Sequence, residues 1–419
     1  MGKWKRSIPD GTRDILFNHC AEKVNIQDCL KKVYIDRGFS EIITSTLEFY
    51  DVFDGDNAGI EQEKMYKLFD NKGRILVLRP DMTTSVARVA ATKLKDSYYP
   101  LKLCYCQNIF RTNEDLNGKR NEFTQSGIEI IGCGTLRADI EVITTAIKAL
   151  LDIGIENFKI ELGQVEFYKG IIEELSLDEE EKEQIRNFIE NKSFGSLRDF
   201  LYSKQESLDV ESIAILNNLP ALFGSIDVLV EARRLTGNKR AIKALDDLEH
   251  IYKMLKALGL DRYISVDLGM VHHIDYYSGL IFRAYIDGIG DDVLYGGRYD
   301  NLVKNFGLDV PATGFAINVD KIWEVLKTQN MEVREGVSPE YIIHCSLERL
   351  SPAHSLAESI VKLGFKCEIT LFDEKEQTIE YAQRRKIRKV LLIEKGGEIY
   401  EFDTVDLCVY RFSLSEVLL

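Results

Sequence analysis

The spacing of hydrophobic residues near the N-terminus predicts a helix followed by strands. Between residues 14 and 37, apolar side chains recur at near-helical spacing, and Gly38 is a typical stop signal. Residues 39–47 and 74–78 are rich in apolar and β-branched side chains and are predicted as strands. The chain is therefore predicted to begin with a helix that is followed by two strands.

A hairpin is predicted next along the chain. Asp81 or Thr83 can cap a helix that begins just after the second strand. Residues 101–111 and 123–131 alternate as strands do, and the polar loop between them contains Asn117-Gly118, a common hairpin turn. These two strands are expected to pair antiparallel.

The pattern changes from about residue 167 to residue 261, where long helical stretches are predicted. The acidic run at 178–181 is typical of a solvated helix start, because the helix dipole favours negative charge there. Strand patterns return at 265–287 and 293–319. We therefore expect a helical insertion at about 167–261 inside a sheet-containing domain that spans residues 1–326.

A polar stretch at 327–340 with Gly336 and Pro339 predicts a linker. The tail, 340–419, then alternates between strand and helix patterns, which predicts a small C-terminal α/β domain with right-handed crossovers. The predicted elements are strands at 341–346, 366–371 and 389–393 and helices at 353–363 and 376–385.

Composition and charge narrow the class of protein. The 419 residues carry a net charge of −14, which argues weakly against a large nucleic-acid footprint. The N-terminus has no apolar signal core, and no apolar run reaches the roughly 20 residues that a membrane span needs. The eight cysteines are scattered and lack metal-ligand spacing. We expect a cytoplasmic protein with no membrane, nucleic-acid or metal partner.

Four segments combine charge, glycine and aromatic residues within strand patterns: residues 78–83, 110–129, 272–279 and 295–300. Their carboxylates suit an ammonium or an imidazole, and an arginine can contact a carboxylate through two hydrogen bonds. Their tyrosines offer flat walls with a polar end. Together they suit a small zwitterion such as an amino acid, although any single segment is as readily a turn or a surface pair. The residues concerned are Asp81, Glu129, Asp275, Arg111, Tyr276, Tyr277 and Tyr299.

These segments resemble class II aminoacyl-tRNA synthetases, and histidyl-tRNA synthetase in particular. Residues 9–14, Pro-Asp-Gly-Thr-Arg-Asp, resemble that family's N-terminal signature. Residues 275–279, Asp-Tyr-Tyr-Ser-Gly, and 296–300, Gly-Gly-Arg-Tyr-Asp, resemble its two histidine-specific motifs. The resemblance spans about residues 7–325. It implies an α+β fold, with an antiparallel sheet, flanking helices and a tail like a reduced anticodon-binding domain.

Several positions depart from the synthetase pattern. His272 stands where the synthetases carry an arginine that stabilises charge on ATP, and a neutral imidazole supplies no fixed charge or bidentate fork. Asn113 replaces the glutamate that reads adenine, and Lys321 replaces an arginine that holds ATP. Lys119 and Asn121 stand at two arginine positions of the synthetases' second sequence motif, and Ser45 stands at the proline position of their first motif.

The resemblance thus combines retained amino-acid contacts with weakened ATP contacts, which is typical of a sensor. In this combination the chain resembles the regulatory subunits of the short-form ATP phosphoribosyltransferase. The Arg-Pro-Asp-Met-Thr run of that family matches residues 79–83. That family is non-catalytic, pairs with the short catalytic subunit in a hetero-octamer, and relays feedback inhibition by histidine. The resemblance implies no cofactor, self-association as a dimer, and free histidine as the ligand.

By the same resemblance, free histidine is expected to bind a site that the retained residues line. Arg111 would bind the carboxylate, the acids the ammonium or imidazole, and the tyrosines the ring. The expected histidine-binding residues are Asp81, Thr83, Arg111, Gln125, Glu129, Asp275, Tyr276, Tyr277 and Tyr299.

Two alternatives stay open from the sequence. An active histidyl-tRNA synthetase would need working ATP and tRNA sites, and the basic cluster at 384–389 is the available anticodon contact. Cations at a helix C-terminus explain that cluster more simply. The other alternative is a free-standing histidine-binding protein. A neighbouring gene for a short phosphoribosyltransferase would favour the regulatory function over both.

Overall fold

The computed structural model describes residues 3–54, 60–113, 120–271, 276–287, 290–328 and 338–412. The chain divides into two compact units, with the main boundary between residues 328 and 341. In the described parts of the chain, no helix is long and apolar enough to cross a membrane.

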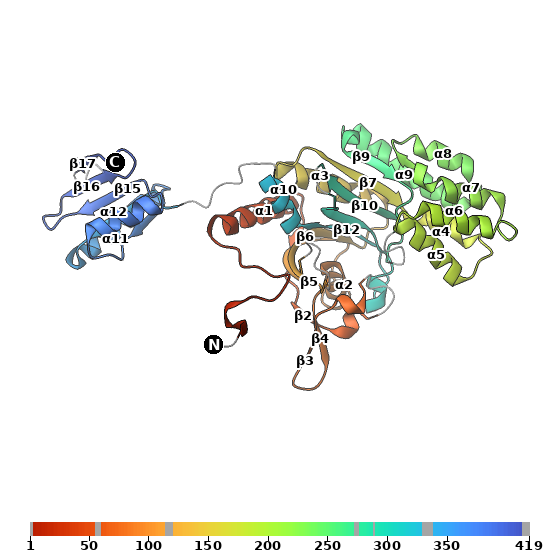
Figure 1. The fold of residues 1–419 in the computed structure, drawn as a ribbon, viewed down its shortest axis with the longest axis horizontal. Helices are drawn as coiled ribbons and strands as arrows, with labels where there is room; N and C mark the ends of the chain where they lie inside the picture. The colour runs from red at the N-terminus through yellow and green to blue at the C-terminus, as the bar shows by residue number, and fades with distance from the viewer. Residues whose placement is uncertain are drawn as a thin grey trace. The chain divides into compact units, whose positions relative to one another are not determined.

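A nine-stranded sheet forms the centre of the larger unit, with strand order β1-β5-β6-β12-β11-β10-β7-β9-β8 among the described residues (Figure 1). The six strands from β5 to β7 in this order pair antiparallel, and only β1 with β5 and β7 with β9 pair parallel. The expected antiparallel sheet is therefore confirmed. Its strands are β1 (Ser40–Glu41), β5 (Leu101–Phe110), β6 (Glu122–Ile131), β7 (Phe158–Gln164), β8 (Phe223–Gly224), β9 (Ile264–Asp267), β10 (Leu280–Ile286), β11 (Leu294–Arg298) and β12 (Ala312–Asn318).

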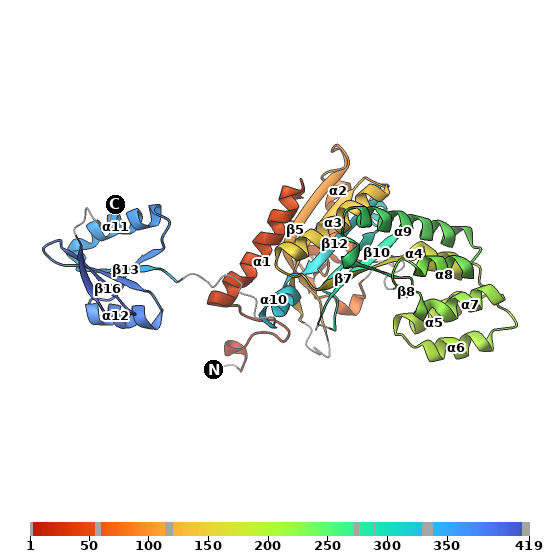
Figure 2. The same cartoon turned by 90° about the horizontal axis from the view of Figure 1, so that it is seen from above.

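Three helices, α1 (Phe17–Asp36), α3 (Leu136–Asp152) and α9 (Lys239–Ala257), lie side by side across one face of this sheet, which we call the back face (Figure 2). Each buries an apolar stripe; in α1 it includes Leu30 and Tyr34. Helix α10 (Val319–Thr328) follows β12 directly. The opposite face, here the front face, receives the start of α2 (Met82–Thr92).

The chain between β7 and β9 is largely helical and lies at the β7 side of the sheet (Figure 1). A helix starts at the acidic run as predicted, and Asp178 and Glu181 form a reciprocal capping box there. The helices that precede α9 here are α4 (Val165–Glu173), α5 (Glu179–Glu190), α6 (Phe194–Ser203), α7 (Val210–Asn218) and α8 (Val228–Leu235).

A small antiparallel sheet has the order β2-β4-β3, with bounds β2 (Leu47–Phe49), β3 (Lys67–Phe69) and β4 (Ile75–Leu78). The prediction of one strand over residues 39–47 is wrong, because only β1 and the first residue of β2 are strand within that range. Arg79 holds the irregular stretch between them through hydrogen bonds to the carbonyl oxygens of Thr44 and Ser45. Hydrogen bonds from the buried Arg79 side chain thus take the place of the strand-to-strand hydrogen bonds that the β-branched pattern predicted.

The smaller unit is a five-stranded sheet of order β14-β13-β15-β16-β17. Strand β13 pairs parallel with β14 and β15, as the alternating tail predicts, whereas β16 and β17 add an antiparallel edge that the sequence did not indicate. Ile343 packs on the α11 side and Ile342 on the α12 side, so the helices cover opposite faces. The elements are β13 (Tyr341–Cys345), α11 (Leu350–Lys362), β14 (Cys367–Ile369), α12 (Lys375–Arg384), β15 (Lys389–Ile393), β16 (Ile399–Asp403) and β17 (Val409–Phe412).

Candidate functional site

Strand register gathers the candidate residues of the central strands on the front face. Glu129 on β6 lies opposite Gly314 on β12, which in turn lies opposite Gly297 on β11. A β-carbon at position 314 would lie 1.7 Å from a Glu129 carboxylate oxygen, so only glycine leaves room for that side chain. The glycines of the two neighbouring strands therefore leave space on the front face for the Glu129 carboxyl group.

Glu129 is completely buried and hydrogen-bonded by tyrosines. The hydroxyl of Tyr105 donates to Glu129 Oε1 at 3.2 Å, and the hydroxyl of Tyr299 donates to Glu129 Oε2. Burial raises the pKa of Glu129 to about 8, with the Asp81 carboxylate adding to the increase, although hydrogen bonds from Tyr299, Thr83 and Tyr105 oppose it. Near neutral pH this group is therefore mostly a neutral acid, which a cation nearby would ionise.

This raised pKa predicts how stability depends on pH. A group whose pKa is higher in the folded state adds stability that is complete below its unfolded pKa and is lost as pH rises through its folded pKa. For Glu129 that window runs from the ordinary pKa of a glutamate, 4.5, to about 8. The free energy of unfolding should fall across it by up to about 1.4 kcal/mol per pH unit. Denaturant titrations at several pH values should show this slope in the wild type and a shallower one in Glu129→Gln; equal slopes would contradict the assignment.

Three tyrosine rings form the wall beside Glu129. The ring of Tyr276 lies 4.7 Å from that of Tyr277, edge-on, and 5.6 Å from that of Tyr299, stacked. Tyr277 and Tyr299 are buried. Burial raises the pKa of all three hydroxyl groups, so they stay neutral hydrogen-bonding groups. The wall is thus aromatic with polar ends, as the sequence predicts.

The first turn of α2 contributes Asp81 and Thr83. Asp81 is the N-cap of this helix, because its carboxylate accepts hydrogen bonds from the backbone N–H and hydroxyl of Thr84. Its charge nevertheless reaches the cluster, since it adds to the effect of burial in raising the pKa of Tyr276. Thr83 lies close enough to moderate the pKa values of Glu129, Tyr105 and Tyr276.

Two side chains of this region have unused hydrogen-bonding groups. Arg111, directly after β5, donates through Nε to the Pro80 carbonyl oxygen at 2.7 Å, and no salt bridge joins it to a described residue. Asp81 is close enough to interact with its charge. The Oε1 atom of Gln125 on β6 is buried and has no hydrogen-bond partner in the described structure. Both groups remain available to a ligand that has a carboxylate and a donor.

The structure thus assembles Asp81, Thr83, Glu129 and the three tyrosines into one cluster, with Arg111 linked to it through Asp81. Gln125 shares the front face, four residues before Glu129 on β6. Asp275 lies outside the described residues. Sequence reasoning missed Tyr105, which alternation along β5 and its pairing opposite Gly127 place on the same face. A β-carbon at position 127 would lie 2.7 Å from the Tyr105 hydroxyl, so this glycine gives the tyrosine its space.

Two positions where the sequence departs from the synthetases lie at the end of the hairpin. Asn113 donates from its side chain to the Arg120 carbonyl oxygen at 3.1 Å and to Asn121 Oδ1 at 3.2 Å. Asn121 in turn donates to the Asp10 carbonyl oxygen at 3.1 Å. These two amides therefore bond to one another and to the chain. Lys119 lies outside the described residues, as do His272 and His273.

The start of α10 is also engaged within the protein. Lys321 Nζ donates to the Asp292 carbonyl oxygen at 2.8 Å and lies 3.2 Å from an Asp291 carboxylate oxygen. The buried Asp320 accepts a hydrogen bond from the backbone N–H of Thr124 at 2.7 Å and pairs with Lys23 and Arg13. Burial opposes ionisation of Asp320, but these partners lower its pKa overall. Asp320 and Lys321 are therefore both engaged in contacts within the chain.

Among the described residues, no group of three or more His, Cys, Asp or Glu side chains is placed to hold a metal ion. The chemistry of the cluster is instead that of recognition. It combines a buried acid that a cation can ionise, an arginine that makes no salt bridge with the described residues, and aromatic walls.

Comparison with known proteins agrees with this geometry. The family model described as histidyl-tRNA synthetase matches residues 11–322. Proteins named ATP phosphoribosyltransferase regulatory subunit are similar along nearly the whole chain. The one from Clostridium novyi is 48% identical over 96% of both chains, and the one from Clostridium acetobutylicum is 50% identical over 95% of this chain and 97% of its own.

Solved structures give the same result. A structure titled ATP phosphoribosyltransferase regulatory subunit/histidyl-tRNA synthetase from Bacillus halodurans is similar with a TM-score of 0.82 and 32% identity, covering 91% of this chain and 97% of that one. Histidyl-tRNA synthetase from Nostoc is similar with a TM-score of 0.80 at 18% identity, covering 99% and 98%. The second likeness is one of fold alone.

Proposed function

The chain belongs to the family of ATP phosphoribosyltransferase regulatory subunits, and from this premise we propose that it activates a short catalytic subunit and makes that subunit sensitive to histidine. The observation that supports the proposal most is the contrast between two regions. The cluster around Glu129 retains the groups that an amino acid needs, whereas Asn113 and Lys321 are committed to contacts within the chain.

In the proposed complex, free histidine occupies the front-face cluster. Arg111 binds its carboxylate through the guanidinium atoms that make no salt bridge with described residues. Glu129 and Asp81 face its ammonium or imidazole, and the three tyrosines enclose its ring. Gln125 receives a donor at its unpartnered Oε1. Asp275 is included in this proposal by resemblance alone.

Direct calorimetry of histidine binding to the purified chain tests this site. We expect one histidine per chain and a net release of protons near neutral pH, because a bound cation would ionise Glu129, whose pKa is about 8 in the free protein. Repeating the titration in buffers of different ionisation enthalpy measures that release. Glu129→Gln should release fewer protons. Absence of binding at millimolar histidine would show that histidine is not the ligand of this chain.

Self-association as a dimer is part of the same proposal and is supported by an uncovered apolar surface. Cross-strand pairing puts Leu47, Phe49, Leu68, Leu76 and Leu78 on one face of the small sheet β2-β4-β3. The first three of these side chains are 41–47% exposed. A contiguous apolar face of this kind marks an interface more often than a free surface.

A charge on this face should separate the two copies. Leu68→Asp is expected to shift the mass measured by light scattering from dimer to monomer, because an interface does not tolerate an unpaired buried carboxylate. The matched control is Val210→Asp, which changes an apolar residue, 84% exposed, at the start of α7. A dimeric Leu68→Asp variant would show that the second copy packs elsewhere.

A further inference from the structure

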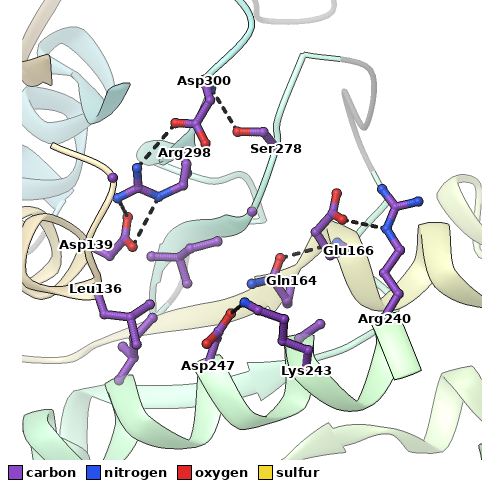
Figure 3. A pocket seen from close by; sticks show the side chains of 15 residues that line it. Leu136, Asp139, Gln164, Glu166, Arg240, Lys243, Asp247, Ser278, Arg298 and Asp300 are labelled. Atoms are coloured by element: carbon purple, nitrogen blue, oxygen red, sulfur yellow. Dashed lines mark hydrogen bonds and ion pairs between the residues drawn. The ribbon is translucent and has the colours of Figure 1, made fainter. Parts of the chain in front are cut away.

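A cavity of about 330 Å³ lies on the back face of the large sheet. Its wall is formed by the starts of α3, α4 and α9 and by the ends of β7 and β11 (Figure 3). The volume is at the lower end of the range for small-molecule sites in proteins. None of the described residues assigned above to histidine lines it.

The cavity and the Glu129 cluster share two chain segments but use opposite faces of the sheet. On β11, Arg298 points to the back and pairs with Asp139 of α3 at 2.9 Å. The next residue, Tyr299, points to the front and donates to Glu129. Likewise Ser278 lines the cavity, while its neighbour Tyr277 belongs to the tyrosine wall. The two sites are therefore distinct but adjoining.

Three carboxylates of the cavity wall each have one uncommitted oxygen. Glu166 uses Oε2 on Arg240, and Asp247 uses Oδ2 on Lys243. Asp300 uses Oδ1 on Arg298 and on the backbone N–H of Ala312. Their second oxygens make no hydrogen bond or ion pair with the described residues. An ammonium group entering the cavity would find acceptors for its donors.

The wall also offers donors. Gln164 is only 7% exposed and lines the cavity (Figure 3). Its Oε1 accepts the backbone N–H of Glu166, which leaves its Nε2 without a partner in the described structure. This nitrogen is not among the fully buried atoms that lack a partner, so it is accessible from the cavity and can donate to an acceptor there. Arg240 likewise uses Nε and Nη1 on Glu166 and Glu173, and its Nη2 is uncommitted.

Apolar side chains complete the wall, namely Leu136, Ala244, Ile251 and Leu280. No metal-binding group of side chains occurs among the described residues, so the spread carboxylates do not converge on one ion. A ligand that satisfies this wall has an ammonium, a carboxylate and an apolar stem.

We propose that this back-face cavity is a second ligand site, which binds a small zwitterion of the aliphatic amino-acid type. Its ammonium is held by the second oxygen of Asp247. Its carboxylate accepts from Gln164 Nε2 and Arg240 Nη2, and its side chain packs on the apolar wall. The site does not depend on histidine binding at the front face.

L-Leucine is the probe, measured by calorimetry on the full-length protein. We expect one site with a Kd of about a millimolar or tighter. 4-Methylpentanoate, which lacks the ammonium, and 3-methylbutylamine, which lacks the carboxylate, should each bind at least about tenfold more weakly. Equal binding of either analogue would overturn the zwitterion assignment, and no leucine binding would overturn the site.

Four variants locate the binding. Ala244→Leu fills the cavity from α9 and should abolish leucine binding, while Ala257→Leu makes the same change at an exposed position of the same helix and should not. Asp247→Asn, at the partly exposed rim, should weaken binding about tenfold even if the filled variant does not fold. Glu129→Gln should leave leucine binding unchanged. If Glu129→Gln abolishes binding and Ala244→Leu does not, leucine occupies the front face and the proposal is wrong.

Discussion

The purified protein, supplied with ATP, histidine and histidine tRNA, is expected to form no charged tRNA above background. Activation of an amino acid by ATP requires fixed positive charge where the carboxylate attacks the phosphate. Asn113 donates to neighbouring oxygens of the chain, and Lys321 contacts Asp291 and Asp292. Loss of one preorganised group typically lowers the rate about 10²–10³-fold, so the combined changes should put charging below detection.

The measurement is aminoacylation, with histidine-dependent ATP–pyrophosphate exchange as a second readout. An active histidyl-tRNA synthetase in the same assay shows that the tRNA accepts histidine. Charging by this chain at a rate comparable to that enzyme would end the regulatory interpretation and restore the synthetase alternative.

The second large effect concerns histidine inhibition of the assembled complex. Glu129→Gln should leave activation of the catalytic subunit intact and move the midpoint of histidine inhibition at least about tenfold higher. The glutamine keeps the shape of the side chain but cannot ionise beside a bound cation. A coupling of about 1–3 kcal/mol between effector and activity is usual, so such a loss of affinity is readily visible.

Two further variants separate charge from structure. Asp81→Asn removes a charge and keeps the N-cap of α2, because asparagine caps as well as aspartate. It should also weaken inhibition without unfolding the helix. Glu122→Gln is the matched control, since it makes the same change on β6 at a residue whose carboxylate accepts a hydrogen bond from Asn108. If the inhibition curves of Glu129→Gln and Asp81→Asn overlay the wild type, these residues are not the sensor.

Patterns of a few neighbouring residues correctly predicted several helices and strands. The expected strands at 101–111 and 123–131 agree within a residue with β5 and β6. The acidic capping box and the tail helices also lie where the sequence indicates them. Alternation, caps and turn residues act over a few positions, and a single sequence contains them in full.

Features that depend on distant partners were not predicted. No element was assigned between residues 132 and 166, where α3 and β7 lie, and residues 39–47 were assigned one strand although Arg79 holds part of them in an irregular path. The site followed the same rule. Resemblance supplied Glu129, but Tyr105 and the need for Gly314 emerge only when strand register brings β5, β6 and β12 together.

The most direct test of the proposed function is the rate of ATP phosphoribosylation by the cognate short catalytic subunit, measured with and without this chain across a histidine titration. The account predicts that the chain raises the rate and that histidine lowers it again, with the midpoint shifted in Glu129→Gln but not in Glu122→Gln. A catalytic subunit whose rate is the same with and without the chain would contradict it, and a free-standing histidine-binding protein would then be the better description.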